Sequence, residues 1–359
     1  MPRVPTLDNA ALAELLAVAS ESAGYPLQKA LRRAPRRAFM WPVEASLLYE
    51  DGRSLTELAG VGPHLERVIR GWFDDPPPLP DVPEIRSGFL TIPAARKLLA
   101  RSPEWTTALR GDLQAHSEWS DGTGTIAEMA QAAALHGYDY LAITDHAQSL
   151  KIAGGIDERQ LRRQAAEIEE VNESLEQAGE RLRVLRSIEL NLNTQGEGDM
   201  PKRALDRLEI VLGCFHSALR KKEDQTERYL QALRNPDIQI LGHPRGRIYN
   251  FRLGLTADWS RVFSVAADLD KAVEIDAYPD RQDLNVDLVR LAAQAGCRIS
   301  LGTDAHGPTQ LEFIELGLAS ALLAKVQPDR VLNFMTRPEL LDWVTAVRDR
   351  SPSTIRKQA

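Results

Sequence analysis

The sequence has few of the features that would place the protein outside the ordinary globular classes. Two cysteines, Cys214 and Cys297, occur among 359 residues, which is too few for a disulfide framework and is typical of a reducing compartment. No apolar run reaches the roughly eighteen residues of a membrane span. The N-terminus also lacks a charged lead followed by an apolar core. These absences predict a cytoplasmic protein that does not bind a membrane.

Basic residues are also fewer than acidic residues. The 44 Lys and Arg residues against 51 Asp and Glu residues give a net charge of -7, which argues against a protein that coats nucleic acid unspecifically. Any contact with nucleic acid must therefore be local. With 43% hydrophobic and 26% charged residues, the composition is that of a globular protein. The length suffices for a barrel-sized domain together with a small module.

Motifs for several other chemistries are missing. The chain has no Gly-x-Ser-x-Gly elbow and no Ser-His-Asp ordering of a serine hydrolase, and no glycine-rich phosphate loop of the NTPase kind. It contains instead a series of short segments rich in His, Asp and Glu. They lie at residues 111–122, 144–146, 187–189, 214–216, 242–244 and 302–306. Residues of these types at such spacing are typical of the ligands of a metal site.

Residues 1–75 are expected to form a helical region. Apolar residues recur there at helical spacing, as at Leu12, Leu15 and Leu16. The segment 27–43 also contains five cations and no acidic residue: Lys29, Arg32, Arg33, Arg36 and Arg37. These cations could form a solvated helix face, or a face that binds phosphate.

Residues 54–70 resemble a helix-hairpin-helix motif. Ser54 and Glu57 predict a capping box, Gly60 and Gly62 predict a tight turn, and Pro63 suits the first turn of the following helix. In that motif the backbone N–H groups of the Gly-Val-Gly hairpin bind a DNA phosphate without reading sequence. The alternative is a plain pair of helices with the same turn chemistry.

The rest of the chain divides into a linker and a large domain. Residues 76–108 combine a proline-rich, stiff linker with a connecting helix, and residues 346–359 are expected to be a flexible tail. Between 109 and 345, short apolar strands alternate with helices. Strands are predicted near 110–116, 139–145, 183–189, 208–215, 238–242, 272–276 and 298–303, and helices near 125–137, 157–178, 225–234, 258–270 and 284–296. Seven strand–helix steps predict a parallel, barrel-like α/β fold with its catalytic groups at the carboxyl ends of the strands.

Residues of metal-ligand type fall at these strand ends. The set comprises five of the seven histidines and three acidic residues: His116, His146, Glu189, His216, His243, Asp276, Asp304 and His306. One histidine in such a place is more readily a satisfied core residue, but chance explains five at one rim poorly. Imidazoles favour zinc or manganese, and carboxylates can bridge two ions and also accept magnesium. The sequence therefore predicts a multinuclear metal site of the kind that hydrolyses phosphate esters.

In their order these segments resemble the polymerase and histidinol phosphatase (PHP) domain, over roughly residues 105–345. The resemblance rests on residues 111–114, 153–155, 241–244, 274–277 and 303–306, which have the form found in the C-terminal PHP domain of bacterial family X DNA polymerases. It implies a distorted seven-stranded barrel with up to three metals. The residues between the hairpin and this domain contain no paired catalytic aspartates on strands, so a polymerase palm does not fit and no polymerase activity is expected.

The resemblance also implies which residues hold the metals. Three groups follow from it: His116, Glu189 and Asp304 for one ion, Glu189, His216 and His243 for a second, and Asp121, His146 and His306 for a third. Gln114 stands beside the first group where many relatives have histidine, and an amide would leave that ion weakly held. Two or three divalent ions are expected, zinc or manganese first, with magnesium or iron as alternatives. His116, Glu189, His216 and Asp304 would form the catalytic core.

Three arginines stand beside the ligand segments: Arg245, Arg247 and Arg281. Their guanidinium groups could bind the phosphate of a substrate through paired hydrogen bonds. They could equally be surface charges on loops.

Three functions are compatible with these features. The leading hypothesis is a metal-dependent phosphodiesterase acting on DNA, a 3′–5′ exonuclease or a 3′-end-processing enzyme of repair, in which metal-bound hydroxide attacks phosphorus. The second is a small-molecule phosphomonoesterase of the histidinol phosphatase type, which should be indifferent to deletion of residues 1–82. The third is a non-catalytic DNA-binding module with structural metals, although pure structure rarely needs three clustered ions. Protein partners are not predicted.

Overall fold

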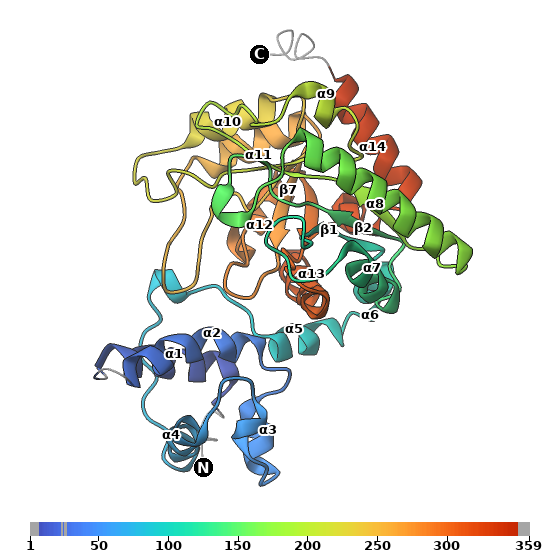
Figure 1. The fold of residues 1–359 in the computed structure, drawn as a ribbon. Helices are drawn as coiled ribbons and strands as arrows, with labels where there is room; N and C mark the ends of the chain where they lie inside the picture. Colours follow the sequence, from blue (N-terminus) through green and yellow to red (C-terminus); the bar gives the residue numbers. More distant parts are fainter. Residues whose placement is uncertain (1–6, 23, 25–26, 351–359) are drawn as a thin grey trace.

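The computed structural model describes residues 7–22, 24 and 27–350, in which a small helical part precedes a larger α/β part (Figure 1). The helical part consists of α1 (Asn9–Ser22), α2 (Leu27–Met40), α3 (Ala45–Glu50), the 3-10 turn η1 (Leu55–Glu57) and α4 (Pro63–Asp74). Its core is apolar and includes the fully buried side chains of Leu12, Leu16, Trp41 and Ile69. The helices expected in this region are therefore present.

The hairpin at residues 54–70 differs from the prediction in its first half. A single 3-10 turn replaces the α-helix, and Glu57 pairs with Arg53. Glu66 of α4 reaches across the turn instead, and its carboxylate accepts hydrogen bonds from the Leu55 N–H (2.9 Å) and from the Ser54 hydroxyl (3.0 Å). The predicted capping box is therefore wrong, because a carboxylate from the second helix takes the place expected for Glu57.

The tight turn of the hairpin is present. Gly60 has φ +79°, a left-handed backbone conformation that favours glycine, and the exposed side chain of Arg37 lies against it. Gly62 precedes α4, whose first residue is Pro63. Both glycines are exposed. The turn thus presents its backbone to solvent, as the hairpin motif requires.

The linker is extended over residues 75–83, and short helices follow it. These are η2 (Glu84–Arg86), α5 (Ile92–Leu99) and α6 (Pro103–Ala108). The single connecting helix predicted here is broken in two, because Pro103 has no N–H to continue a helix and starts α6 instead.

The α/β part alternates strands and helices along the chain. Its strands are β1 (Gly111–Ala115), β2 (Tyr140–Ile143), β3 (Arg183–Arg186), β4 (Glu189–Asn191), β5 (Leu212–Cys214), β6 (Ile240–Leu241), β7 (Ala272–Asp276) and β8 (Arg298–Gly302). Its helices are α7 (Ile126–Leu135), η3 (Lys151–Ala153), α8 (Glu158–Gln177), α9 (Lys202–Leu205), α10 (Thr226–Arg234), α11 (Trp259–Asp268), α12 (Val286–Gln294), η4 (Pro308–Phe313), α13 (Ile314–Leu323), η5 (Pro328–Arg330), η6 (Leu332–Phe334) and α14 (Arg337–Asp349). The five predicted helices are present as α7, α8, α10, α11 and α12.

The beginning of the predicted tail belongs to α14, and residues 351–359 lie outside the described residues. No described helix combines the length and the apolar character needed to cross a membrane.

The strands form two parallel sheets, with orders β1-β2-β3 and β4-β5-β6-β7-β8. The parallel α/β fold is confirmed, with eight strands in two sheets, while a seven-stranded barrel stays a prediction. The predicted strand at 183–189 is split into β3, which pairs with β2, and β4, which pairs with β5. Parallel bridges between Ala115 and Ala305, and between His146 and Glu189, join the two sheets beyond their strand ends.

One aromatic side chain anchors the helical part to the α/β part. Tyr249 follows β6 in the chain, yet it is buried in the core of the helical part. Its ring packs edge-on against Phe39 and Phe89, with centroids 4.9 and 5.2 Å away. Deleting residues 1–82 would therefore expose the Tyr249 ring to solvent and disturb the α/β part as well.

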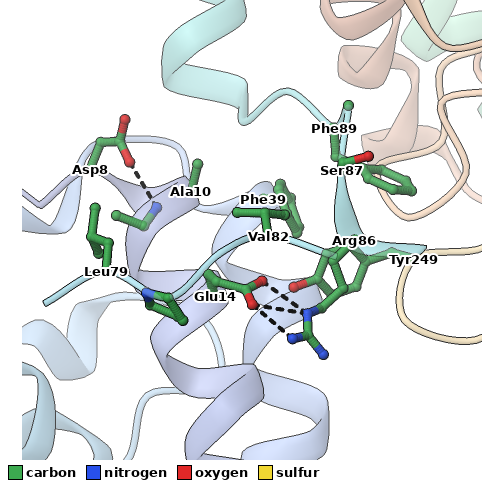
Figure 2. A pocket seen from close by; sticks show the side chains of 13 residues that line it. Asp8, Ala10, Glu14, Phe39, Leu79, Val82, Arg86, Ser87, Phe89 and Tyr249 are labelled. Atoms are coloured by element: carbon green, nitrogen blue, oxygen red, sulfur yellow. Dashed lines mark hydrogen bonds and ion pairs between the residues drawn. The ribbon is translucent and has the colours of Figure 1, made fainter. Parts of the chain in front are cut away.

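A buried ion pair lies beside this contact and lines a cavity of about 400 Å³ (Figure 2). Arg86 donates to Glu14 from Nη2 (2.8 Å) and from Nε (2.9 Å to Oε2). Both side chains are less than a tenth exposed. Each charge is therefore compensated by the other and by little solvent.

Replacing Arg86 by Met is expected to lower the free energy of unfolding by roughly 3–5 kcal/mol, because Glu14 would remain as a buried charge without a partner. Adding Glu14→Leu should restore most of the loss, since neither charge is then buried. Denaturant unfolding followed by tryptophan fluorescence measures both effects. Arg101→Met, at an exposed arginine, is the matched control. A loss below about 1 kcal/mol in the single variant would contradict the expectation.

Candidate metal centre

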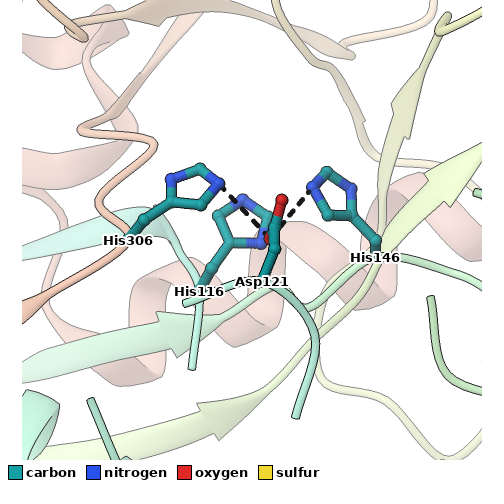
Figure 3. Close-up of side chains that lie close together, drawn as sticks. All are labelled: His116, Asp121, His146 and His306. Atoms are coloured by element: carbon teal, nitrogen blue, oxygen red, sulfur yellow. Dashed lines mark ion pairs between the residues drawn. The ribbon is translucent and has the colours of Figure 1, made fainter. Parts of the chain in front are cut away.

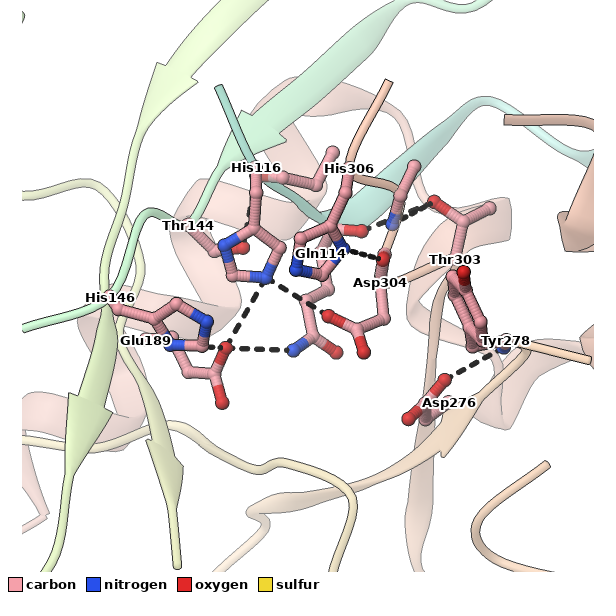
Figure 4. A network of polar contacts seen from close by, with 12 residues as sticks. Gln114, His116, Thr144, His146, Glu189, Asp276, Tyr278, Thr303, Asp304 and His306 are labelled. Atoms are coloured by element: carbon pink, nitrogen blue, oxygen red, sulfur yellow. Dashed lines mark hydrogen bonds and ion pairs between the residues drawn. The ribbon is translucent and has the colours of Figure 1, made fainter. Parts of the chain in front are cut away.

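The nine predicted ligand residues converge at one edge of the two sheets. Figure 4 shows Gln114, His116, His146, Glu189, Asp304 and His306 among them. Most follow the carboxyl end of a strand: His116 after β1, His146 after β2, His216 after β5, His243 after β6, and Asp304 and His306 after β8; Gln114 lies within β1, Asp121 in the loop beyond it, and Glu189 at the start of β4. The parallel registers align these ends, and the two bridges beyond them bring the sheets together. The sequence pattern therefore placed these residues at one rim correctly.

Glu189 is the hub of the centre. Its carboxylate is fully buried, and Oε1 lies 2.6 Å from Nε2 of His243 and 2.8 Å from Nε2 of His216. Oε2 lies 3.3 Å from His116 and 3.3 Å from His146. Burial alone would raise the pKa of Glu189, but the surrounding imidazoles hold it well below its ordinary value. The side chain is thus an ionised carboxylate that four rings share.

His116, Glu189 and Asp304 form the first predicted group. Their ligand atoms lie within 4.8 Å of one another, and Nε2 of His116 is 3.0 Å from Oδ1 of Asp304. Beside them Gln114 donates from Nε2 to Glu189 (3.3 Å). Its buried Oε1 has no hydrogen-bond partner among the described residues, so this oxygen is free to act as a ligand.

Asp121, His146 and His306 form the third predicted group, to which the structure adds His116 (Figure 3). Oδ1 of Asp121 lies 3.3 Å from Nε2 of His306 and 3.5 Å from Nε2 of His146. The ring of His116 stacks on both histidine rings at 4.5 Å. Burial raises the pKa of Asp121, yet hydrogen bonds from the two histidines bring it far below normal. Its side chain is 35% exposed, so this group forms the mouth of the centre.

The second predicted group meets at Oε1 of Glu189, which both His216 and His243 contact, and the two rings lie 5.4 Å apart. The structure adds His146 beside His216 and Cys214 beside His243. The side chain of Cys214 is fully buried. Burial, followed by the charge of Glu189, raises the pKa of its thiol well above normal. A protonated thiol is a poor ligand. The position of Cys214 at the end of β5 was the signal that could have placed it here.

The side chains fit divalent metals. Some buried polar atoms at the centre have neither a hydrogen bond nor an ion pair among the described residues: Gln114 Oε1, His116 Nδ1 and Glu274 Oε1. Others face only charged groups of the centre itself, as Nε2 of His216 faces Glu189 (2.8 Å) and Oδ2 of Asp304 faces Arg281 (3.0 Å). Buried polar atoms are normally paired, and each one left alone costs about 1–3 kcal/mol. Imidazole and carboxylate groups with unused ligand atoms suit ions such as zinc and manganese. The cost would be recovered when such ions bind.

Residues behind the ligands hold them in place. Asn191 accepts through Oδ1 from Nδ1 of His216 (3.0 Å), which leaves Nε2 of that ring facing Glu189. Asp145 accepts from the Ser117 N–H (2.8 Å) and from Gln164 Nε2 (2.6 Å), and so fixes the loop that carries Asp121. Only the folded chain shows that Asn191 contacts His216, because the two residues lie 25 positions apart in the chain.

Replacing Asn191 by Ala is expected to weaken metal affinity about 10–100-fold, because residues that orient a ligand histidine contribute this much to binding. Asn191→Asp keeps the acceptor oxygen and should retain most of the affinity. Competition with a metal-binding dye measures the affinity of both variants. Equal affinities of Asn191→Ala and the parent protein would show that His216 needs no such support.

One of the three candidate phosphate-binding arginines lies at the centre. Arg281 places Nη1 3.0 Å from Oδ2 of Asp304. Arg247 is instead buried, stacks 3.8 Å above the ring of Phe89 and donates to the Ser87 carbonyl (2.9 Å). Arg245 donates to a backbone carbonyl at 3.3 Å. The guanidinium of Arg247 is thus committed to the linker, whereas Arg281 faces the ligands.

The candidate DNA contacts lie in the helical part and are only partly free. Arg36 pairs with Asp280 of the α/β part at 3.2 Å. Arg33 and Arg37 are exposed, and Arg37 lies along the turn at Gly60. The side chain of Arg32 lies outside the described part of the chain. The basic segment therefore serves the contact between the two parts as well as the surface.

Comparison with known proteins agrees with this geometry. Residues 112–278 match the PHP domain family. The chain is 34% identical over 226 residues to the DNA polymerase/3′-5′ exonuclease PolX of Bacillus subtilis (strain 168), an alignment that covers 63% of this chain and 39% of that protein. It is 26% identical over 220 residues to a protein of Thermoanaerobacter sp. (strain X514) named a probable phosphatase, covering 58% of this chain and 83% of that protein. A solved histidinol phosphate phosphatase from Lactococcus lactis, complexed with zinc, L-histidinol and phosphate, aligns with a TM-score of 0.43 and 16% identity over 60% of this chain and 93% of that chain.

Proposed function

Because residues 112–278 form a PHP domain, we propose that the protein is a metal-dependent phosphodiesterase that removes nucleotides from the 3′ end of DNA. The observation that carries the proposal is the convergence of His116, His146, His216 and His243 on the single buried carboxylate of Glu189. The similarity to a relative named as a 3′–5′ exonuclease supports the choice of DNA. DNA repair is the process in which such an activity would serve.

The side chains divide the work between them. Divalent ions bound at the centre would neutralise phosphate oxygens and make water a stronger nucleophile near neutral pH. His116, Glu189, His216 and Asp304 would hold these ions. Arg281 is placed to donate to a phosphate oxygen that approaches Asp304. Substrate would enter at the mouth beside Asp121.

The helical part would hold DNA by its backbone. The exposed Gly60 and Gly62 of the turn offer backbone N–H groups for phosphate, whereas the Val61 N–H donates to the Leu58 carbonyl (3.0 Å). Arg33 and Arg37 add positive charge beside it. Contacts of this kind carry no sequence information, which suits an enzyme that acts on any 3′ end.

The test is release of nucleotides from DNA labelled near its 3′ end. The parent protein with manganese should release them, and His216→Ala and Asp304→Ala should each abolish the release because each removes a ligand. His136→Ala, at an exposed histidine, is the matched control. Full activity in both ligand variants, from protein free of contaminating nuclease, would rule the proposal out. A panel with recessed and single-stranded DNA, RNA and 3′-phosphate ends, each with manganese, zinc or magnesium, defines the substrate.

A second function, a phosphatase for small phosphate monoesters, is favoured by the alignment that covers 83% of a phosphatase-named relative. Deletion of residues 1–82 does not separate the two functions, because Tyr249 and Asp280 of the α/β part contact the helical part. The deletion would therefore disturb the α/β part and affect both activities. Arg33→Glu is a cleaner probe, since Arg33 is exposed. It should slow DNA hydrolysis far more than hydrolysis of a small monoester if DNA is the substrate.

A further inference from the structure

Two loops beside the metal centre carry an unusual set of cationic and aromatic side chains, all of them exposed except the half-buried Arg252. One follows His216 and contains Arg220, Lys221 and Lys222; the other follows His243 and contains Phe251 and Arg252. We call these five residues the arginine–aromatic surface. Phe251 is 50% exposed and is the one aromatic residue among the large apolar side chains that the described part of the chain leaves open to solvent. The guanidinium of Arg220 lies 4.6 Å above its ring.

The arginine–aromatic surface is continuous with the metal centre. Burial lowers the pKa of Arg252, and the nearby positive charges of Arg281 and Arg220 lower it further. Arg252 also donates from Nε to the carbonyl of Gly246, whose N–H donates to the His243 carbonyl (3.0 Å), and a Cβ on Gly246 would lie 3.1 Å from Cδ2 of Leu219. The two loops therefore lie against each other beside His243. Their cations lie near Arg281, which reaches Asp304 at 3.0 Å.

The cations of this surface outnumber the acidic residues beside them. In the described residues, no ion pair involves Arg220, Lys221, Lys222 or Arg252. Glu223 and Asp224 follow Lys222 in the chain, and Asp224 accepts from the Thr226 N–H (2.9 Å). Asp280 pairs with Arg36 (3.2 Å), Asp283 accepts from the Gly246 N–H (2.6 Å), and Arg252 donates from Nε to the Gly246 carbonyl. Cations without an ion-pair partner on a chain of net charge -7 favour a site for an anion.

An exposed ring among cations fits one kind of anion. Unpaired bases stack on aromatic side chains whatever their identity, while arginines bind the phosphates between them. Bases within a duplex are already stacked on each other and cannot reach a ring on a flat surface. The pairing of Phe251 with Arg220 and Arg252 therefore suits a single strand better than a duplex.

We propose that the arginine–aromatic surface binds single-stranded DNA next to the metal centre, with a base stacked on Phe251 and phosphates held by Arg220 and Arg252. This inference rests on the proposed function and narrows its substrate to a 3′ end that is unpaired. The DNA strand would pass along the cations of the arginine–aromatic surface to Arg281. A duplex would have to fray before its terminal nucleotide could enter.

Equilibrium binding tests the inference separately from catalysis. The probe is a fluorescein-labelled single-stranded oligonucleotide, followed by anisotropy in EDTA so that no hydrolysis occurs. Phe251→Ala should raise its Kd about 5- to 100-fold, the range known for loss of base stacking. Arg220→Ala should also raise Kd and should reduce the salt dependence of binding by about one phosphate contact. Leu135→Ala, at an apolar residue that is 85% exposed on α7, is the matched control and should bind as the parent protein does.

Hydrolysis by the same variants with manganese adds a second readout. In Phe251→Ala the KM for the oligonucleotide should rise at least about tenfold more than the KM for a small phosphodiester, because the small ester has no base that reaches the ring. Thermal melting confirms that each variant folds.

The possible results separate the two proposals. If the parent protein binds the strand and both variants bind it with the same Kd, the surface has no role in binding and the inference is wrong, while the proposed function stands on its own hydrolysis data. Tighter binding of a blunt duplex than of the single strand would also overturn it. If binding follows the inference but no nucleotide is released with any metal, the proposed function fails instead. A loss on RNA that exceeds the loss on DNA would overturn the choice of DNA.

Discussion

Replacing Glu189 by Gln is expected to lower phosphoesterase activity at least about a thousand-fold and to deplete the protein of bound metal. Glu189 is the carboxylate on which His116, His146, His216 and His243 converge. An amide of the same shape has no charge to share between ions, and its NH₂ group would face ring nitrogens. Loss of several kcal/mol of charge stabilisation corresponds to roughly this factor in rate.

Metal analysis and rate measurement together check this expectation. Elemental analysis after gel filtration gives the metal content, and release of nucleotides from a 3′ end gives the rate. Glu173→Gln, at an exposed position of α8, makes the same chemical change away from the centre and should alter neither. Retention of full metal content and a rate within tenfold of the parent protein would show that Glu189 is not the shared ligand.

Replacing Arg281 by Met is expected to lower kcat/KM for a phosphodiester about a hundred-fold while the bound metal is retained. Removing one well-placed donor to a developing oxyanion costs roughly this factor. Nη1 of Arg281 lies 3.0 Å from Asp304, and its Nε is 4.0 Å from Asp276. Its positive charge competes with metal ions for these carboxylates. Removal of Arg281 should therefore strengthen metal binding, so a lower rate of hydrolysis in the variant cannot come from lost metal.

Two further variants serve as controls for this experiment. Arg281→Lys keeps the charge but not the planar fork, and should recover the activity only in part. Arg290→Met removes a half-buried arginine of α12 that pairs with Asp287 (2.7 Å), away from the ligands, and should leave kcat/KM unchanged. If Arg281→Met hydrolyses the phosphodiester at the parent rate, then Arg281 serves only to neutralise Asp304 and does not touch the substrate.

Much of the fold followed from local pattern. Helices α7, α8, α10, α11 and α12 fall where the apolar period and the capping residues predicted them. Capping depends on neighbours in sequence, as when Thr125 and Glu128 form a capping box at the start of α7. The break between α5 and α6 could also have been read from Pro103. The split of one strand at Ile188 could not, because it depends on Leu212 as a partner.

The rim of ligand residues followed from sequence because parallel strands bring their carboxyl ends together. A histidine that follows a strand, such as His116 or His243, must then lie at that edge whichever strand is its neighbour. The partition of ligands among groups needs more than this. His216 lies between His146 and His243, with both rings 5.4 Å away, and its position depends on ring orientations fixed by packing and by Asn191.

Charge was the least predictable property from sequence. Arg36 and Arg247 both looked free to bind phosphate, but the fold engages Arg36 with Asp280 and packs Arg247 against Phe89. The unpaired arginine with an exposed aromatic partner proved to be Arg220 beside Phe251, residues that no local pattern links. Sequence by itself determined which residue types stand at the strand ends, because strand period and strand ends are local. Only the tertiary structure decided which of these side chains meet and which cations keep a free charge, since both depend on contacts between segments far apart in the chain.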